Sequence, residues 1–476
     1  MKRRKFLLQL GYALPTSLML PAMLSSCEKN EDTVGIKSEK KYKNYKVIII
    51  GAGASGLYAG WYLQERGFDV SILEASDKIG GRIRHLSGFA DFEIELGAEE
   101  VHGTNSEWYK IIQQTNATLL HQNMNDDFYF FRQDPGNTNE AILKSEAQAK
   151  QYNEYLKAMN FVDSAYNYTG PDMTVEQHLA GSGISWSLFD VVNAKLGNEH
   201  GTSNARLSIK GLAEEDSMWS AGDNNYVLKT RTMLSVLETK FAPVLSKVTK
   251  NVQVKKIDYG GAKIILTDQI GRTYEADRAI VTVPLKILQD GVISFTPALP
   301  STKLSALENI GMGAGMKAVF KFSQAFWKNL LGGNLGSILG YPAVPEVYAA
   351  NSGKGQTPLL TAFIMGEKAE QFSSQGSNAA GVILSHLDNI FGGNVASQSK
   401  DDMYIMDWAK EPFIRGAYSY PKVGGGLIFR KELATPVGDR IFFAGEATHF
   451  EGHSGTVHGA IETSIRVVKE LEESIF

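Results

Sequence analysis

Residues 47–56 read Val47-Ile48-Ile49-Ile50-Gly51-Ala52-Gly53-Ala54-Ser55-Gly56, and they are the strongest indication of the fold. Four consecutive aliphatic residues are typical of a strand that is buried on both faces of a parallel sheet. The glycines have the spacing of a dinucleotide-binding turn, and the pattern after them predicts a helix that ends before Gly67. A second apolar run, 69–73, ends at Glu74. This order of strand, glycine turn, helix, strand and acid predicts a nucleotide-binding α/β unit.

Each residue of the glycine turn has a physical task. Gly51 permits the tight turn, Gly53 lets the backbone approach a pyrophosphate, and Gly56 lets helix and strand pack closely. Ala54 and Ser55 begin the helix, where free N–H groups and the positive end of the helix dipole attract phosphate. The turn by itself does not separate NAD from FAD.

The residues after the second strand identify the dinucleotide. Glu74 would accept hydrogen bonds from the adenosine ribose. Residues 79–82 read Ile-Gly-Gly-Arg, and residues 95–103 read Glu-Leu-Gly-Ala-Glu-Glu-Val-His-Gly. The first run resembles the second FAD fingerprint of glutathione-reductase-like proteins, in which Gly81 and Arg82 hold the flavin side. The second resembles the flavin-dependent amine oxidases, particularly polyamine oxidases and lysine-specific histone demethylases, and implies that Gly97 and Ala98 border the cofactor.

Further stretches resemble this family in its own order along the chain. They are the predicted hairpin 252–267 with the strand 278–285, the segment 313–327, the aromatic segment 408–420 and the C-terminal motif 443–460. The resemblance implies that Val254 contacts adenine and that Lys317 holds a water against flavin N5. It also implies that Trp408 and Tyr418 shape the slot beside the flavin ring. The match begins near Tyr45 and is thinnest between 105 and 217.

The C-terminal motif has a physical interpretation as well. After residue 455, apolar residues recur at three- and four-residue intervals, which predicts an amphipathic helix. Its first residues, Thr456 and Val457, would face the flavin, where the helix dipole stabilises negative charge on the reduced ring. The resemblance makes Glu446, at a glycine turn with Gly445, a ligand of the ribityl or phosphate side.

Lys317 and the histidines each leave two interpretations open. Lys317 lies in an apolar run, so it either faces the flavin or is a solvated lysine of an edge strand. His102 matches a histidine at the catalytic tunnel of several polyamine oxidases, or makes only ordinary hydrogen bonds. His449, His453 and His458 lie close together, but glycines interrupt their helical spacing and no thiolate accompanies them. We expect no metal.

Departures from the family pattern limit the class of substrate that we expect. Ala417 stands where monoamine oxidases carry the cysteine that attaches flavin, so we expect non-covalent FAD. Thr456 stands at the place of the second cage tyrosine, which leaves room for a bulkier amine. Amino-acid oxidases place an arginine soon after Leu-Gly to bind a carboxylate, whereas this chain has Glu99 and Glu100. These two acids favour a second cationic group, as in a di- or polyamine, or serve as loop carboxylates.

Residues 1–27 have the features of an export signal. The stretch Arg3-Arg4-Lys5-Phe6-Leu7 resembles a twin-arginine signal, and Leu24-Ser25-Ser26-Cys27 resembles a bacterial lipobox, in which Cys27 is lipidated. Cys27 is the only cysteine, so no disulfide can form within the chain. Residues 28–44 are polar and predict a tether. We expect an exported lipoprotein of the bacterial cell envelope, attached to the membrane through its lipid alone.

The chain has 476 residues and a net charge of −4, so it is too long for one ordinary domain and lacks the basic excess of a nucleic-acid-binding protein. We predict an α/β fold, with a glutathione-reductase-like Rossmann FAD-binding domain interleaved in sequence with an α+β substrate domain. The first is expected to span 45–104, 222–292 and 425–476. The second is expected to span 105–221 and 293–424, with a helical pattern over 140–159.

The resemblance implies FAD-dependent oxidation of a small-molecule amine. Hydride would pass to flavin N5, the imine would be hydrolysed to an aldehyde, and O2 or another acceptor such as a quinone would take the electrons, giving H2O2 from O2. The sequence is also compatible with three alternatives. They are a related FAD-dependent desaturase or dehydrogenase acting on an apolar substrate, an L-amino-acid oxidase, and a non-catalytic flavin-binding envelope protein.

Overall fold

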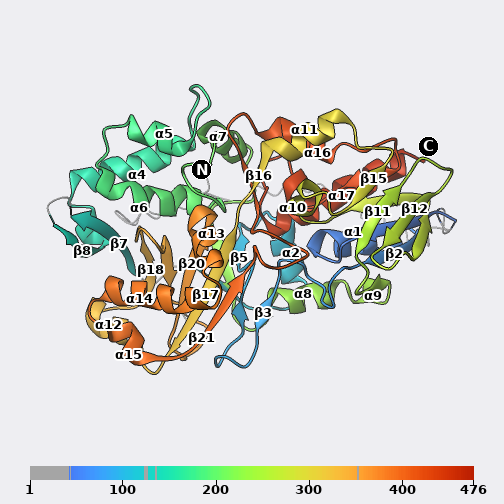
Figure 1. The fold of residues 1–476 in the computed structure, drawn as a ribbon. Helices are drawn as coiled ribbons and strands as arrows, with labels where there is room; N and C mark the ends of the chain where they lie inside the picture. The colour runs from blue at the N-terminus through green and yellow to red at the C-terminus, as the bar shows by residue number, and fades with distance from the viewer. Residues whose placement is uncertain (1–41, 43, 123–126, 135–136, 351–352, 476) are drawn as a thin grey trace, which may run out of the picture.

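The computed structural model describes residues 42, 44–122, 127–134, 137–350 and 353–475, which form two units lying side by side (Figure 1). The expected export signal, its lipidation site Cys27 and most of the tether lie outside these residues. Within the described part of the chain, no helix has both the length and the apolar character needed to cross a membrane.

A five-stranded parallel sheet, in the order β10-β2-β1-β14-β23, forms the centre of the first unit. Its strands are β10 (Val248–Thr249), β2 (Asp69–Leu73), β1 (Lys46–Ile50), β14 (Arg278–Val281) and β23 (Ile441–Phe443). Parallel sheets are covered on both faces, which is why the strands consist of nearly continuous aliphatic residues. The predicted Rossmann architecture is confirmed, and the glycine turn lies where β1 ends.

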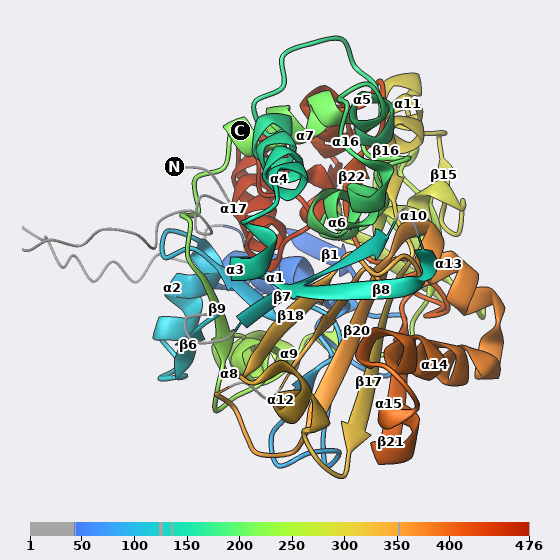
Figure 2. The ribbon, with the colours of Figure 1, turned by 90° about the vertical axis from the view of Figure 1, so that its left-hand side faces the viewer.

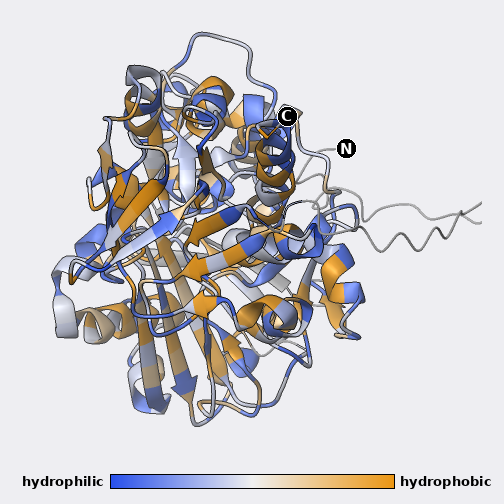
Figure 3. Cartoon of the chain, turned by 90° about the vertical axis from the view of Figure 1, so that its right-hand side faces the viewer, coloured by the Kyte–Doolittle hydropathy of each residue, from blue (hydrophilic) through white to orange (hydrophobic). Residues whose placement is uncertain are grey.

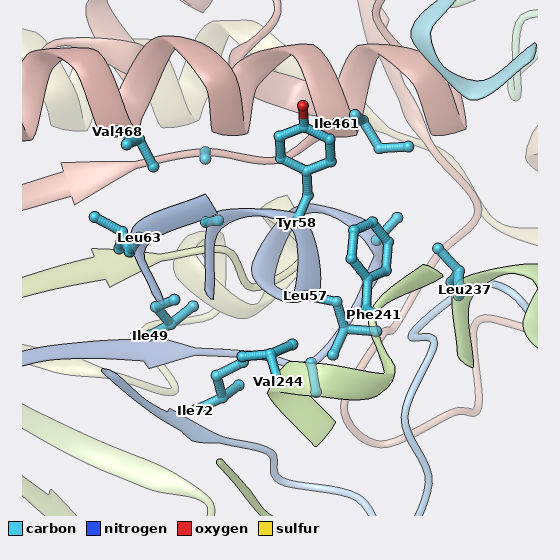
Figure 4. Packing of buried hydrophobic residues seen from close by; sticks show 14 of the residues in the cluster. Ile49, Leu57, Tyr58, Leu63, Ile72, Leu237, Phe241, Val244, Ile461 and Val468 are labelled. Carbon is cyan, nitrogen blue, oxygen red and sulfur yellow. The ribbon is translucent and has the colours of Figure 1, made fainter. Parts of the chain in front are cut away.

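Two helices cover one face of this sheet in successive layers. Helix α1 (Ala54–Glu65) packs Leu57 against the sheet, and helix α17 (Val457–Glu473) packs Ile461 on the outer side of α1 (Figure 4). The first residues of the unit are therefore held in place by the last helix of the chain. Complete burial of each such aliphatic side chain contributes about 1.5–3 kcal/mol to stability.

Two further groups of elements belong to the first unit, and some of them lie outside the boundaries that the sequence predicts for it. The predicted hairpin is present as β11 (Val254–Asp258) and β12 (Ile264–Asp268), and β15 (Ser294–Thr296) pairs with β11 in the same sheet. Helix α2 (Glu107–Gln113) buries Trp108 in the same core as α1. The expected boundaries at 104 and 292 are therefore wrong, because α2 and β15 pack with the first unit.

The second unit is built on a seven-stranded mixed sheet in the order β21-β17-β20-β19-β18-β7-β8. Its strands are β7 (Asp127–Asp134), β8 (Asn137–Ser145), β17 (Gly315–Phe322), β18 (Leu335–Leu339), β19 (Glu346–Tyr348), β20 (Leu359–Met365) and β21 (Lys400–Asp407). Helix α14 (Ala379–Phe391) buries Ile383 and Leu387 against this sheet. Helices α4 (Asn153–Ala165) and α7 (Ile209–Ser217) lie above the sheet in the view of Figure 2.

The helical pattern expected over 140–159 is only partly correct. Residues 137–145 form β8, which pairs antiparallel with β7, and the helices begin only at α3 (Glu146–Ala149) and α4. Residues 137–145 form a strand despite their helical spacing, because pairing with β7 supplies cross-strand hydrogen bonds and side-chain contacts. Colouring by hydropathy shows apolar segments along the inner strands and hydrophilic residues on loops and outer helix turns (Figure 3).

Candidate active site

A cavity of about 1450 Å³ is lined by residues of both units. Its volume exceeds the roughly 300–1,000 Å³ of ordinary small-molecule sites. Of the cofactor and substrate residues expected from the sequence, all but Gly56 line it. One continuous cavity therefore brings together segments that are far apart along the chain, with space for an extended dinucleotide and a substrate.

The glycine turn has the geometry that its sequence predicts. Gly51 has φ +110, in the region that favours glycine. Gly56 lies so close to the turn that an added Cβ would come within 1.9 Å of the Gly51 carbonyl oxygen, which explains why it is packed away from the cavity. A Cβ at Gly53 would instead meet no atom nearer than the Cα of Gly81, at 4.0 Å. A Cβ added at either glycine would therefore lie at ordinary contact distance from the Cα of the other.

These features fit FAD. Gly53 is the N-cap of α1 and supplies no side-chain hydrogen bond, so the first N–H groups of a twelve-residue helix are available to a phosphate. The hydroxyl of Ser55 lies 2.8 Å from that of Ser464 on α17, so Ser55 can contribute its backbone N–H, with its side chain joining the two helices. The cradle formed by Gly53 and Gly81 is the place where the pyrophosphate backbone would approach.

Glu74 lies just after the end of β2, beside this turn. Its carboxylate accepts hydrogen bonds from the backbone N–H of Ala52 at 2.7 Å and of Ser76 at 2.8 Å. Burial raises the pKa of Glu74, although these bonds oppose the shift. Val254, expected at adenine, begins β11 and lines the same cavity as Glu74.

Glu446, expected as a ligand of the ribityl or phosphate side, lines the cavity and is also bonded to protein donors. Its carboxylate accepts from Arg82 Nη1 at 2.8 Å, from Ser419 Oγ at 2.6 Å and from the Gly455 N–H at 2.9 Å. Burial alone would raise the pKa of Glu446, but Arg82, Ser419 and Arg430 outweigh burial and lower it. Protein donors occupy both oxygens, so Glu446 orients Arg82 and the turn before α17.

A second ion pair continues this network across the two units. Arg430 of α16 (Leu427–Ala434) is 1% exposed, and its Nε donates to Glu215 of α7 at 2.6 Å. Its Nη1 donates to Ser419 Oγ, also at 2.6 Å. Removing one partner of a buried pair typically costs about 3–5 kcal/mol, so this link fixes the two units against each other beside the cavity.

The N-terminus of α17 borders the cavity as predicted. Gly455, Thr456 and Val457 line it, and Thr456 is the N-cap residue. The Thr456 hydroxyl accepts from the Gly459 N–H at 2.9 Å and donates to the His453 carbonyl at 2.7 Å. Its hydroxyl therefore caps the helix, and its small side chain leaves that wall of the cavity open.

The two expected aromatic residues are held rigidly in the cavity wall. The Trp408 indole N–H donates to the Leu96 carbonyl at 3.0 Å, and a Cβ at Gly97 would meet the Trp408 ring at 2.8 Å. The Tyr418 hydroxyl donates to the Glu199 carbonyl at 2.7 Å, at the end of a π-helical turn over 194–198. Because each polar tip is bonded to backbone, the rings keep one orientation.

Lys317 is buried, and its interpretation as a solvated edge-strand lysine is wrong. It lies on β17 between β20 and β21 and is 4% exposed. Its Nζ donates to Glu99 Oε2 at 2.8 Å and to the Glu95 carbonyl at 3.2 Å. An ammonium has three donors, so these two bonds leave one N–H for the cavity that Lys317 lines.

Glu99 has partners that exclude it as the binding group for a cationic substrate. Besides Lys317, it accepts from Lys354 Nζ at 2.9 Å and from the Tyr348 hydroxyl at 2.7 Å. Burial would raise the pKa of Glu99, but Lys317 and Lys354 outweigh it and hold this pKa well below its ordinary value. The expectation that Glu99 contacts substrate is therefore corrected, because its charge is already paired.

Glu100 and His102 form a more open group on β5 (Glu100–His102). Nδ1 of His102 lies 3.0 Å from Asn225 Oδ1 and 3.8 Å from Glu100 Oε2. The Glu100 side chain is 37% exposed, and both residues line the cavity together with Asp223. Oδ1 of Asp223 is buried and has no hydrogen-bond partner among the described residues. Glu100 and Asp223 thus add two carboxylates to the wall that His102 lines.

His449, His453 and Glu462 could be considered as metal ligands, since their ligand atoms lie within 4.8 Å of one another. In each ring, the nitrogen that faces away from Glu462 accepts a hydrogen bond from a backbone N–H. His449 Nδ1 accepts from the N–H of His453 at 3.1 Å, and His453 Nε2 accepts from the N–H of Ser220 at 3.2 Å. The nitrogens facing Glu462 therefore carry the protons and donate to it, at 3.0 and 2.6 Å. A metal would need lone pairs at those positions, so the cluster is satisfied as a hydrogen-bonded group.

Comparison with known proteins identifies the family of the chain. Residues 54–471 match the family model described as flavin containing amine oxidoreductase. The chain belongs to this family. The flavin-containing amine oxidoreductases use FAD, which the cradle at Gly53 and Gly81 fits, and this chain is an oxidoreductase that acts on amines.

Curated relatives of this amine oxidoreductase include plant proteins. Probable polyamine oxidase 4 of Arabidopsis thaliana is 27% identical over 471 residues, which cover 90% of this chain and 87% of the relative. Lysine-specific histone demethylase 1 homolog 2 of Oryza sativa subsp. japonica is 25% identical over 446 residues, which cover 89% of this chain and 56% of the relative.

Solved structures share the fold of this amine oxidoreductase. A wild-type putrescine oxidase bound to putrescine has a TM-score of 0.74 at 20% identity, covering 90% of this chain and 99% of that chain. Cyclohexylamine oxidase from Brevibacterium oxydans IH-35A has the same score, identity and coverage. At this identity the likeness concerns the fold, a Rossmann FAD-binding domain with a substrate domain.

Sequence patterns miss four residues of the site, which are Asp223, Lys354, Tyr348 and Arg430. Lys354 lies between two glycines and Tyr348 lies in a three-residue strand, and neither context signals a buried ionic contact. Arg430 does carry a signal, because it shares the buried face of α16 with Leu433 and Ala434. A basic residue on an apolar helix face indicates a buried partner.

Proposed function

We propose that this amine oxidoreductase oxidises a di- or polyamine with non-covalent FAD. The observation that carries the proposal is the pair of carboxylates, Glu100 and Asp223, that lines the cavity with His102. Among the described residues, neither has a charge partner as close as the one that Glu99 has. A carboxylate in a partly enclosed cavity attracts an ammonium group, and a diamine carries a second one at a distance from the reacting carbon. Putrescine oxidase and polyamine oxidases among the similar proteins agree with this substrate class.

Different residues of this chain have different roles around the reacting amine. FAD, when bound, accepts two electrons and a hydrogen from the carbon beside the amine nitrogen and passes the electrons to O2 or another acceptor. Trp408 and Tyr418 confine the amine, and Lys317 directs one N–H into the cavity, where it can hold a water. The imine product is then hydrolysed to an aldehyde. With O2 as acceptor, H2O2 is the second product.

The alternative of an apolar substrate is disfavoured by the same carboxylates. A desaturase site has no use for Glu100 and Asp223 in its cavity wall, because burying unpaired charge against an apolar ligand is costly. An α-amino acid would bring a carboxylate toward these two acids and would be repelled. Both alternatives, and a flavin-binding protein without turnover, are separated by one experiment.

That experiment is anaerobic mixing of the FAD-loaded protein with a panel of compounds. We expect putrescine and spermidine to bleach the flavin absorption band, benzylamine to do so more slowly, and phenylalanine or an amine-free apolar compound to leave it unchanged. Subsequent exposure to air should restore the band with release of H2O2. If none of the amines bleaches the band, the proposed function is wrong.

Substitution of Glu100 by Gln tests the binding of the second ammonium. We expect KM for putrescine to rise at least tenfold, about 1.4 kcal/mol, with little change for benzylamine, because only the diamine loses a charged contact. Glu93→Gln is the matched control, since Glu93 is exposed and hydrogen-bonds Ser87 away from the cavity. Steady-state kinetics on both substrates checks the prediction. An equal rise of KM for both amines would contradict it.

We also propose that residues 1–27 export the protein and anchor it to the bacterial envelope through Cys27. The twin-arginine and lipobox patterns support this, and they lie outside the described residues. Replacing Cys27 with Ser should move the protein from the membrane fraction to the soluble fraction of cells that express the full chain, since the lipid on this cysteine is the only expected anchor. Immunoblotting of the fractions checks this. Replacement of Ser38 in the tether serves as the control, and an unchanged membrane fraction in Cys27→Ser would exclude lipid anchoring.

A further inference from the structure

Two lysines with buried side chains share one partly buried carboxylate in the cavity wall. Glu99 accepts from Lys317 at Oε2 and from Lys354 at Oε1, at 2.8 and 2.9 Å, so the carboxylate bridges the two ammonium groups. The side chains of Lys317 and Lys354 are 5% and 4% exposed. Burial this deep limits screening of the charges by solvent, so they act on whatever occupies the cavity.

The charges of this group do not cancel. Two lysines and one glutamate give 2 − 1 = +1. Glu95 of β4 (Ile94–Glu95) also faces the group, but burial, and then the charge of Glu99, raises the pKa of Glu95 to about 8, so it is largely uncharged at neutral pH.

Of the remaining neighbours of Lys317, Tyr348 adds no charge, whereas Glu346 is a carboxylate two strands away in the same row of the sheet. Tyr348 of β19 stays protonated, because burial and then Glu99 raise its pKa well above the ordinary value. The strands on both sides of Lys317 place Phe363 and Met406 opposite it. Glu346, on the same strand as Tyr348, accepts a hydrogen bond from Ser337 at 3.0 Å.

We infer that Lys317, Glu99 and Lys354 act as one charge cluster whose surplus positive charge keeps an amine bound against this wall in its uncharged, reactive form. The inference rests on the proposed function, and it assigns Glu99 and Lys354 as positioning residues for that reaction. An amine in water at neutral pH is mainly an ammonium, which has no lone pair to assist cleavage of the neighbouring C–H bond. A like charge nearby disfavours the ammonium form.

The carboxylates of Glu100 and Asp223 and the Lys317–Glu99–Lys354 cluster have net charges of opposite sign, and these charges orient a diamine. Glu100 and Asp223 attract an ammonium, whereas the Lys317–Glu99–Lys354 cluster repels one. The substrate therefore binds with its charged nitrogen at Glu100 and its uncharged nitrogen at the cluster. Lys354 is essential to this arrangement, because Glu99 and Lys317 alone would form a neutral pair.

Three variants separate the charge of the cluster from its packing. Lys354→Met removes one positive charge and leaves a net charge of zero. The double variant with Glu99→Gln and Lys354→Met restores +1 with different atoms. Glu99→Gln alone leaves two ammonium groups without a counter-charge. Lys321→Met is the matched control, since Lys321 lies on the same strand and pairs with the exposed Asp401, at 3.2 Å.

The first two readouts need no turnover. The midpoint potential of the bound flavin should become more negative in Lys354→Met, because a positive charge near the ring stabilises its reduced form, and should return toward the wild-type value in the double variant. Thermal unfolding of the FAD-free protein should show the largest loss of Tm in Glu99→Gln, with partial recovery in the double variant. Lys321→Met should change neither quantity.

The third readout is the pH profile of flavin reduction by putrescine under anaerobic conditions. In Lys354→Met the pH of half-maximal reduction rate should rise by about one unit, a tenfold change in the acid dissociation constant of the bound amine. The double variant should reverse this rise. A merely structural role for Lys354 predicts no such reversal, because a second substitution would add damage.

The outcomes decide the inference separately from the proposed function. If Lys354→Met folds and shifts neither the flavin potential nor the pH profile, or if the double variant fails to restore them, the inference is overturned. If Glu99→Gln does not fold, Lys354→Met and the double variant still decide the inference. If no amine reduces the flavin in any variant, the proposed function fails and the role toward the amine falls with it, while the flavin potential and Tm still establish or exclude the charge cluster.

Discussion

Replacing Gly53 with alanine is expected to weaken FAD binding at least tenfold, about 1.4 kcal/mol, while the protein stays folded. The reason is the position of the added Cβ, which would lie 4.0 Å from the Cα of Gly81, at the place where the pyrophosphate backbone has to approach. The backbone of Gly53 has φ −77 and ψ −176, which any residue adopts, so alanine brings no strain. Titration of the FAD-free protein with FAD measures the affinity.

Gly56→Ala is the matched comparison three residues further on. There the Cβ would lie 1.9 Å from the Gly51 carbonyl oxygen, so α1 and β1 would have to separate. We expect a loss of at least about 3 kcal/mol in the free energy of unfolding of the FAD-free protein. Denaturant titration of both variants distinguishes a binding glycine from a packing glycine. The assignment of Gly53 to the cofactor fails if its alanine variant retains full FAD affinity.

Replacing Lys317 with methionine is expected to slow flavin reduction or re-oxidation by more than tenfold, over about 1.4 kcal/mol in activation free energy. Methionine keeps most of the apolar length of the side chain but removes the N–H that Lys317 can direct into the cavity. Glu99 keeps Lys354 and Tyr348 as partners, so the wall should not collapse and FAD should stay bound. Stopped-flow absorbance in each half-reaction gives the rates.

Lys321→Met controls for the loss of a lysine from β17, because Lys321 pairs with Asp401 toward the other end of the strand. It should leave both half-reactions unchanged. Wild-type rates for Lys317→Met in both half-reactions would exclude Lys317 from the mechanism. Loss of FAD from that variant would show instead that the lysine supports the cofactor site.

The parts of the fold that sequence predicts are those with local causes. The turn from β1 through Gly51 to α1 is set by residues within one stretch, and α17 is set by apolar spacing over its own length. Strand β8 carries a helical spacing, but its identity depends on pairing with β7, which that spacing does not record. The boundaries at 104 and 292 fail for the same reason, since α2 and β15 are assigned by what they pack against.

The candidate site shows the same division. Lys317 can be singled out because a lysine in an apolar strand needs a special partner. Charge alone places its partner Glu99 near substrate, whereas the structure pairs Glu99 with Lys354, which is 255 residues away in the chain. Likewise, the C-terminal motif singles out Glu446 but does not reveal that Arg82 and Ser419 donate hydrogen bonds to its oxygens. Long-range pairing of buried charges is the part that sequence spacing does not reveal.

The order of strands in the parallel sheet has a consequence for how the protein folds during its synthesis. Strand β1 pairs with β14, and β14 pairs with β23, which ends at Phe443, so the sheet draws on nearly the whole chain. Helix α17, which follows it, seals the layer over α1. A ribosome must therefore deliver almost every residue before the cofactor cradle exists. Insertion of the flavin is then a post-translational event, and a nascent chain stalled before this helix would remain colourless.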